Sequence, residues 1–285
     1  MTIKRATVLI TGVSTGIGFD ATRYLIEQGY HVVGSVRKAA DADRLQSVFP
    51  AHFTPLLFDV TDAAAIAAAV GQVAKLVGQR GLAALVNNSG ISGTAPLMHV
   101  PMSEVRQMFE VNVFGLLQVT QAFLPLLGAK KDCPHPPGRV INISSISGGL
   151  VFPFVGSYGA TKHAVEALTD ALRRELSIFG IRVVAIEPGN IRTPIWDKAN
   201  DADTRFATTA YASMVAKLPA MLAEMGRKGD PVATVSRKIH RAIASANPKT
   251  RYPMTFLWRL SRVLGDRALD RLTQSAMGIK KSEAV

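Results

Sequence analysis

The sequence has few of the residues that build disulfide-rich or metal-binding proteins. It contains one cysteine, Cys133, among 285 residues, so no internal disulfide can form, and this residue is most simply an incidental loop thiol. Its six histidines are scattered without the spacing of a metal site. Apolar runs are short and interrupted, so we expect neither a membrane-spanning segment of about 18 residues nor a signal peptide. These absences favour a cytoplasmic protein without a metal.

Acidic residues are also scarce, because 33 Lys and Arg face 21 Asp and Glu and give a formal net charge of +12. The basic residues are spread along the chain without a nucleic-acid recognition motif, so we expect no nucleic-acid partner. Some positive charge is typical near a phosphate-bearing ligand. A further share interleaves with apolar residues in the segment 247–285, an amphipathic helical pattern. This extension is expected to pack on the domain. The less favoured alternatives are that it caps the substrate cleft, contacts a partner subunit or lies on an anionic membrane.

The sequence has no Pro- or Ser-rich linker, no low-complexity tract and no repeat of fixed period. Strand and helix signals instead alternate from residue 4 to about residue 188. This alternation predicts an α/β fold: one Rossmann-like, doubly wound parallel sheet with helices on both faces, in a single domain over residues 1–285. Strands are expected at residues 4–10, 30–36, 54–58, 83–87, 140–144 and 182–187, and helices at residues 16–28, 63–77, 102–127 and 158–179.

A glycine pattern follows the first expected strand. Gly12, Gly16 and Gly18 allow a tight turn and a close approach of the backbone to a phosphate at the N-terminus of the next helix. That helix ends near Gly29, a plausible C-cap, and a second strand follows. A glycine pattern within a strand, turn, helix and strand of this kind is specific for a dinucleotide-binding unit.

Tyr158 and Lys162 stand four residues apart, which places their side chains on one face of a helix. A tyrosine hydroxyl has an ordinary pKa near ~10, and a neighbouring cation favours the phenolate and lowers this pKa. The pair is therefore expected to act as a general acid and base. Ser145 lies thirteen residues before Tyr158, at the end of an apolar strand, where its hydroxyl can meet the substrate oxygen. Adjacent Ser144 is the alternative, but the thirteen-residue spacing favours Ser145.

The ordered motifs resemble the short-chain dehydrogenase/reductase family over most of the chain. The glycine pattern, the Asn-Asn-Ser-Gly sequence at 87–90, the Pro-Gly turn at 188–189 and the Ser, Tyr and Lys above all match the family in order and spacing. Ser89 stands where alanine is usual, and residues 128–138 form a longer loop than a minimal member needs. The regions 187–196 and 251 onward look most like the retinol and 17β-hydroxysteroid dehydrogenase branch.

This resemblance implies the roles of the site residues. Tyr158 exchanges a proton with the substrate oxygen, Ser145 hydrogen-bonds that oxygen, Lys162 binds the nicotinamide ribose, and Asn112 extends a proton path through a bound water. Asn112 lies inside a helix that it suits poorly, which hints at a kink or a special role. The cofactor contacts implied by the resemblance are Gly12, Ser14, Thr15, Gly16, Ile17, Gly18, Arg37, Asp59, Val60, Asn88, Ser89, Gly90, Tyr158, Lys162, Pro188, Gly189, Ile191 and Thr193.

The end of the second strand indicates which dinucleotide binds. NAD-binding members of this fold place an acidic residue there, whereas this chain has Val36 followed by Arg37. A guanidinium binds a 2′-phosphate through charge-assisted hydrogen bonds, while a carboxylate repels it. NADP(H) is therefore favoured, and NAD(H) remains an alternative if Arg37 is only a solvated charge.

The substrate and the partners are less defined. Residues 190–230 are rich in Ala, Met and Leu, and the resemblance places there a cover over the substrate cleft. Such a cover suits a hydrophobic alcohol or carbonyl substrate, although the same residues are also typical of buried helix faces. The apolar helices at 102–127 and 158–179 favour a homodimer or homotetramer. The alternative functions are a catalytically silent dinucleotide sensor and a membrane-surface protein on the same fold.

Overall fold

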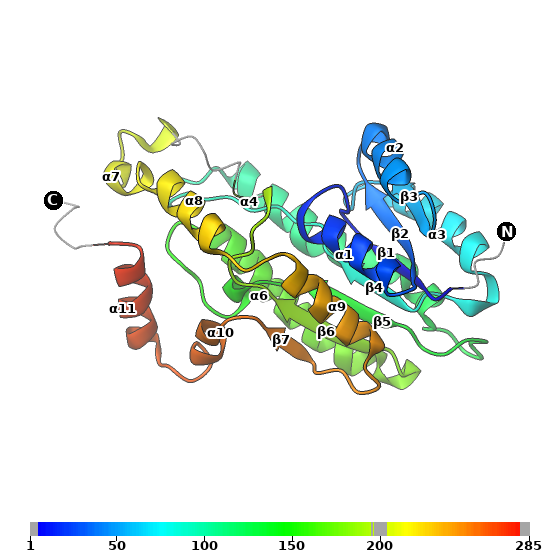
Figure 1. The fold of residues 1–285 in the computed structure, drawn as a ribbon. Helices are drawn as coiled ribbons and strands as arrows, with labels where there is room; N and C mark the ends of the chain where they lie inside the picture. Colours follow the sequence, from blue (N-terminus) through cyan, green and yellow to red (C-terminus); the bar gives the residue numbers. More distant parts are fainter. Residues whose placement is uncertain (1–4, 195, 197–203, 280–285) are drawn as a thin grey trace.

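Seven parallel strands form one sheet in the computed structural model, in the order β3-β2-β1-β4-β5-β6-β7 (Figure 1). The structure describes residues 5–194, 196 and 204–279. The order changes direction between β1 and β4, the arrangement of a doubly wound dinucleotide-binding sheet, so the predicted fold class is confirmed. The strands are β1 (Thr7–Ile10), β2 (His31–Val36), β3 (Phe53–Leu57), β4 (Ala84–Asn87), β5 (Arg139–Ile143), β6 (Arg182–Glu187) and β7 (Arg251–Pro253).

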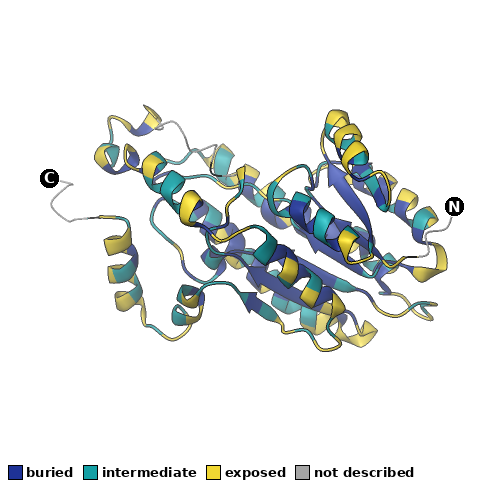
Figure 2. Cartoon of the chain, in the orientation of Figure 1, coloured by how far each residue is buried: buried dark blue, intermediate teal, exposed yellow. Residues whose placement is uncertain are grey.

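Helices cover both faces of the sheet, and the strands between them are buried (Figure 2). One face carries α1 (Gly16–Glu27), α2 (Ala39–Val48) and α9 (Ala233–Ala244). The other carries α3 (Ala63–Val77), α5 (Gly115–Phe123) and α6 (Gly156–Glu175). The remaining helices are α4 (Met102–Phe109), α7 (Ala212–Val215), α8 (Leu218–Lys228), α10 (Phe256–Leu260) and α11 (Asp266–Ala276).

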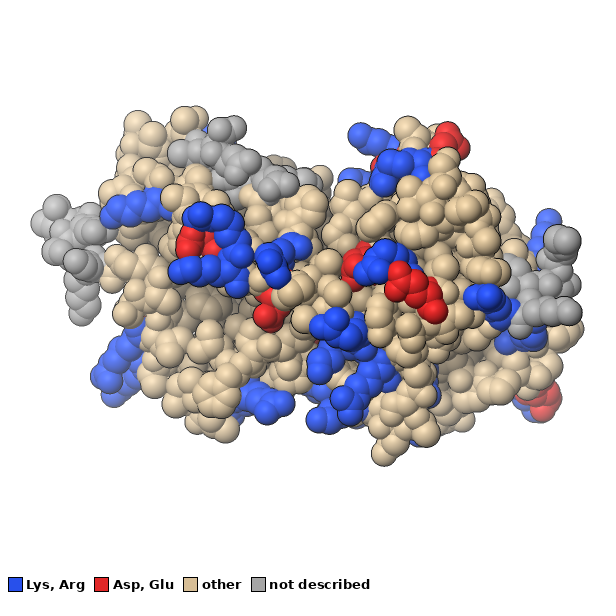
Figure 3. All heavy atoms as spheres, in the orientation of Figure 1, with Lys and Arg blue, Asp and Glu red and all other residues tan. Residues whose placement is uncertain are grey.

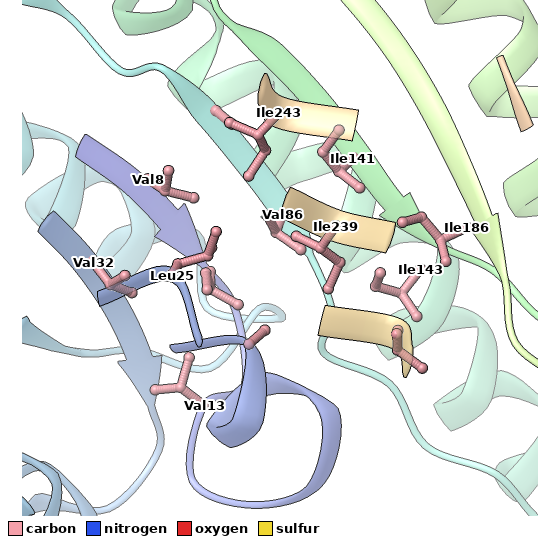
Figure 4. Packing of buried hydrophobic residues seen from close by; sticks show 14 of the residues in the cluster. Val8, Val13, Leu25, Val32, Val86, Ile141, Ile143, Ile186, Ile239 and Ile243 are labelled. Atoms are coloured by element: carbon pink, nitrogen blue, oxygen red, sulfur yellow. The ribbon is translucent and has the colours of Figure 1, made fainter. Parts of the chain in front are cut away.

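Successive side chains of each strand point to opposite faces of the sheet, and so they enter two different cores. In β1, Val8 and Ile10 join the core under α1 and α9, whereas Leu9 joins the core under α3 and α5. Figure 4 shows Ile239 and Ile243 of α9 over the strands of the first core. Burying an isoleucine of this kind stabilises the fold by roughly 1.5–3 kcal/mol. The sheet is packed on both faces by these two cores, which hold the carboxyl ends of its strands in position.

The C-terminal extension differs from the prediction at its start. The segment from residue 247 was expected to be an amphipathic helix, but Arg251–Pro253 forms β7 and pairs with β6. Arg251, expected among the basic residues of that helix, is mostly buried, and it forms ion pairs with Glu166 and Asp170 of α6 at 2.9 and 2.8 Å. The amphipathic pattern holds only beyond β7, where α10 and α11 follow.

One long helical segment bears on the expectation that no segment spans a membrane. Within the described residues, the segment Met102–Leu127 is long and apolar enough to cross a membrane, although no such segment was expected from the sequence. It comprises α4, a π-helical turn (Glu110–Phe114), α5 and a short 3₁₀ turn (Leu124–Leu127). Of its most apolar stretch 44% is buried, and α5 packs against α3 and β4, as a core helix of this fold does.

Candidate active site

The glycine turn between β1 and α1 brings backbone to the surface where a phosphate could approach. Gly12 and Gly16 adopt φ angles of +70° and +58°, which favour glycine. A Cβ atom on Gly18 would lie 2.2 Å from the Gly12 carbonyl oxygen, so no larger residue fits there. The Thr15 side chain at the N-cap accepts no hydrogen bond from the helix. The helix N-terminus therefore keeps its positive end for an anion.

The residues that directly follow β4 hold this turn in place. The Thr11 hydroxyl accepts hydrogen bonds from the backbone N–H groups of Asn88 and Ser89, at 3.0 and 2.9 Å. The Asn88 amide donates to the carbonyl oxygens of Thr11 and Gly12, at 2.8 and 2.9 Å. Asn88 was predicted as a cofactor contact, and in the structure its side chain shapes the cofactor turn.

Tyr158, Lys162 and Ser145 meet at the carboxyl edge of the sheet. Tyr158 lies in the first turn of α6, and the Lys162 ammonium nitrogen is 5.6 Å from the centre of its ring. The same ammonium donates to the carbonyl oxygen of Ile143, the last residue of β5, at 2.9 Å. Ser145, two residues after β5, is hydrogen-bonded to Tyr158 and accepts a hydrogen bond from the Ser147 N–H at 3.1 Å. The spacing argument for Ser145 over Ser144 thus agrees with the geometry.

The pKa of Tyr158 is raised, whereas the sequence predicted that it would be lowered. Burial raises the pKa of Tyr158, and the hydrogen bond with Ser145 lowers it only in part. Burial also lowers the pKa of Lys162 to about 8, against the opposing effect of Glu166. The expected lowering of the tyrosine pKa is therefore wrong for this structure, because burial outweighs the hydrogen bond with Ser145. Tyr158 is protonated at neutral pH, the form that a proton donor needs.

Asn112 occupies the π-helical turn of the long helix. Its side chain is 1% exposed; Oδ1 accepts from the Ile91 N–H and Nδ2 donates to the Ile91 carbonyl, both at 2.8 Å. Nδ2 also lies 3.1 Å from the Thr161 hydroxyl. Single π-helical turns inside α-helices are frequent at functional sites, which fits the special role that the sequence suggested for this position. The side chain ties the loop after β4 to α6, and a role in a proton path stays a prediction.

A family model described as short chain dehydrogenase matches residues 6–204. This chain belongs to the short-chain dehydrogenase family.

Known members of the family extend the likeness over almost the whole chain. The "NADPH-dependent 3-dehydrocapnine reductase" of Ornithobacterium rhinotracheale is 42% identical over 268 residues, which cover 93% of this chain and 94% of the relative. Human "Retinol dehydrogenase 5" is 33% identical and covers 87% and 80% of the two chains, which confirms the expected branch. The solved structure "ElxO with NADP Bound" is 25% identical, with a TM-score of 0.71 over 87% and 96% of the two chains.

The dehydrogenase presents basic groups where the adenosine end of a dinucleotide would lie. Val36 ends β2 and is buried, while the Arg37 side chain is 70% exposed, with Nη1 3.8 Å from Asp59 Oδ2. Arg44 of α2 was missed from the sequence, because α2 itself was not predicted. Its guanidinium donates to the Ser14 carbonyl oxygen at 2.7 Å and pairs with Asp41. Two arginines thus lie on the side of the glycine turn that the sequence assigned to the ribose phosphate.

The loop after β6 lies opposite the glycine turn. The Pro188 carbonyl accepts from the Ile146 N–H at 2.8 Å, which ties the loop to the turn that follows Ser145. A Cβ atom on Gly16 would lie 3.6 Å from the Thr193 side chain, so the two predicted halves of the cofactor site face each other. A Cβ atom on Gly90 would lie 3.2 Å from Asn112 Oδ1 and 3.8 Å from Lys162 Nζ, so Gly90 is close to both side chains. The Val60 side chain is buried against Gly115, the first residue of α5.

The predicted substrate cover forms a small apolar cluster of its own. Phe206, Met214, Val215 and Leu218 are buried with Ala95 and Phe154 of the adjoining loops. Residues 195 and 197–203 of the predicted cover lie outside the described residues. Burial of these side chains is compatible both with a cover over the cleft and with the alternative of a buried helix face. Among the described residues no group of three or more His, Cys, Asp or Glu side chains could hold a metal ion.

Proposed function

We propose that this dehydrogenase reduces the carbonyl group of a hydrophobic ketone or aldehyde, and oxidises the matching alcohol in the reverse direction. The observation that carries the proposal is the meeting of Tyr158 and Ser145, which are hydrogen-bonded at the carboxyl edge of the sheet, with the Lys162 ammonium 5.6 Å from the tyrosine ring. An acid of this kind, held next to a second hydroxyl, suits proton transfer to an oxygen bound between them.

The residues around the substrate oxygen divide the reaction between them. The Ser145 and Tyr158 hydroxyls would both hydrogen-bond the carbonyl oxygen and polarise it. As the carbon gains a hydride, the phenol proton passes to the oxygen, which leaves an alcohol and a phenolate. The Lys162 ammonium, 5.6 Å from the ring, stabilises that phenolate. In alcohol oxidation the phenolate takes the proton back.

The cofactor is NADP(H), as the sequence predicted, since a close relative is named as NADPH-dependent and a similar structure holds NADP. The residues fit this group, because the turn around Gly12 and Gly18 leaves no room for a side chain where the backbone would meet a phosphate. The glycine turn would hold the pyrophosphate, Arg37 and Arg44 the 2′-phosphate, and Lys162 the nicotinamide ribose. When bound, the reduced cofactor supplies the hydride.

Exposed apolar side chains beside Tyr158 support a hydrophobic substrate. Leu97, Met98 and Val151 are 64%, 77% and 40% exposed. A Cβ atom on Gly156 would lie 2.6 Å from Leu97, and one on Gly159 would lie 2.9 Å from Val151, so both side chains rest on the first turn of α6. An apolar rim at this place favours a long or bulky apolar group next to the reacting carbonyl. The relative named for 3-dehydrocapnine makes that compound the first substrate to assay.

The proposal is tested by following NADPH absorbance with a panel of ketones. The panel contains 3-dehydrocapnine, straight-chain ketones of increasing length and a small polar ketone of equal reactivity. We expect kcat/KM to rise with apolar chain length and to be lost in Tyr158→Phe. Binding of NADPH without turnover of any member would favour the silent dinucleotide sensor and reject the proposal. Equal activity on the polar ketone would reject the hydrophobic substrate alone.

A further inference from the structure

A pocket, which we call the amino-edge pocket, lies at the opposite end of the sheet from Tyr158. It has a volume of about 510 Å³ and is bordered by the starts of β1 and β5, the loop before β4, and the ends of α3 and α9. Parallel sheets of this kind bind their substrates at the carboxyl ends of the strands. The amino-edge pocket is therefore separate from the dehydrogenase site, and catalysis does not account for it.

Three arginines line the amino-edge pocket: Arg5, Arg80 and Arg139. The lining includes no Asp or Glu, and within the described part of the chain none of the three arginines forms an ion pair with a carboxylate. The exposed Pro136 and Pro137 contribute an apolar surface to the same lining. The pocket thus combines concentrated positive charge with a surface on which the uncharged part of a ligand can rest.

Arg139 is the central charge of this pocket. It is half-buried at the first position of β5, and its guanidinium donates to the carbonyl oxygen of Ala242 in the last turn of α9. Burial and the like charge of Arg182 both lower the pKa of Arg139, yet an arginine remains protonated in a protein. The Ala242 carbonyl at a helix C-terminus offers only a partial negative charge. A half-buried cation is thus held against a second cation without a full counter-charge, an arrangement that an anion would relieve.

The surroundings add to the positive potential. Arg182, the like-charged neighbour, donates to the Asn247 side-chain oxygen and also lacks a carboxylate partner among the described residues. Figure 3 shows Lys and Arg side chains gathered over α9, whose C-terminal end borders the pocket, while Asp and Glu in this view lie mostly elsewhere. Such a field raises the local concentration of anions.

We propose that the amino-edge pocket binds a phosphate group, held by the guanidinium groups of Arg5, Arg80 and Arg139 with the hydroxyl of Tyr30 as a further donor. Guanidinium groups bind the oxygens of a phosphate in bidentate pairs. Three guanidinium groups offer more donors than the two oxygens of one carboxylate can accept, which favours a phosphate as the ligand. Burial raises the pKa of Tyr30, so its hydroxyl keeps the proton it would donate. The phosphate could belong to a small solute or to a lipid headgroup, and the experiment separates the two.

The first arm titrates inorganic pyrophosphate into the full chain by calorimetry. Saturating NADP⁺ is present, so that the cofactor site is not available to the probe. We expect binding with a Kd below about 1 mM. The double variant Arg5→Ala/Arg80→Ala should weaken this binding roughly ten- to a hundredfold, since it removes two charge-assisted contacts. Arg139→Gln, which keeps a hydrogen-bond donor for Ala242, should weaken binding at least about tenfold.

The matched control is Arg267→Ala/Arg271→Ala, which removes two exposed arginines of α11 and lowers the net charge equally. The second arm measures co-sedimentation with phosphatidylglycerol vesicles and with neutral phosphatidylcholine vesicles. Pyrophosphate binding that depends on the pocket arginines and not on α11 supports a solute site. Binding to anionic vesicles alone with the same dependence supports a lipid headgroup. The proposal is overturned if neither probe binds, or if both double variants weaken binding equally, because general attraction would then suffice.

Discussion

Replacing Glu187 by glutamine should make the dehydrogenase more stable than the wild type at alkaline pH. Glu187 ends β6 with no exposed surface, and neither of its carboxylate oxygens makes a hydrogen bond of normal geometry. The nearest cation is Arg251, with Nε at 3.5 Å. The charged and titratable groups of this cluster are Glu166 and Asp170 of α6, Arg251 and Tyr252 of β7, and Arg262 after α10.

The magnitude follows from the titration of this carboxyl group. Burial, and then the charge of Glu166, raise the pKa of Glu187 from 4.5 to about 8. Between these values the folded protein holds a proton that the unfolded chain releases, so stability is full below pH 4.5 and falls as the pH rises through 8. The loss is about 1.4 kcal/mol per pH unit, or roughly 3 kcal/mol between pH 5 and pH 8. Glutamine stays neutral and avoids it.

The assay is urea unfolding of wild type and Glu187→Gln at pH 5, 6, 7 and 8. We expect the difference in free energy of unfolding, variant minus wild type, to increase at each increase in pH. Glu175→Gln, at an exposed position of α6 with no ion pair among the described residues, is the control and should give a constant difference. A wild-type-to-variant difference for Glu187→Gln that does not change with pH would refute the reasoning, because the carboxyl group would then be ionised throughout.

Three further predictions concern catalysis, cofactor choice and assembly. Tyr158→Phe should abolish turnover while NADPH binding, measured by fluorescence, stays near wild type; activity above about a tenth would remove the tyrosine from the acid/base role. Arg37→Ile should lower the NADPH:NADH ratio of kcat/KM by about ten- to a hundredfold, and Val36→Asp with it should extend the shift toward NADH; an unchanged ratio after Arg37→Ile would contradict our assignment. Light scattering should find a homodimer or homotetramer, and Phe114→Glu, at a side chain 53% exposed on the long helix, should shift it toward monomer; an active wild-type monomer at micromolar concentration would reject this assembly.

Local patterns made part of this fold predictable. Helix α3 was expected at 63–77 and is found there, because Asp62 caps its first turn by accepting from the Ala65 N–H and Gly78 ends it. The relation of Tyr158 to Lys162 follows from helical spacing alone. The glycine pattern was likewise recognisable because its residues are close in the sequence, although the turn is held by contacts from residues after β4.

Non-local contacts account for what could not be predicted. Strand β7 has only three residues and exists through pairing with β6, so its own sequence carried no strand signal. Arg251 looked like one more basic residue of a tail, since its partners Glu166 and Asp170 lie more than eighty residues earlier. The pKa of Tyr158 moved against expectation for the same reason, because burial is a property of the whole fold.

The central place of β1 in the sheet also sets an order of assembly. β1 pairs with β2 on one side and with β4 on the other, and Thr11 and Asn88, which tie the glycine turn, are 77 residues apart. A chain made from its N-terminus completes β1, α1 and β2 well before β4 emerges from the ribosome. One edge of β1 therefore waits unpaired during synthesis, and the turn that receives the cofactor reaches its final shape only once the later strand has docked.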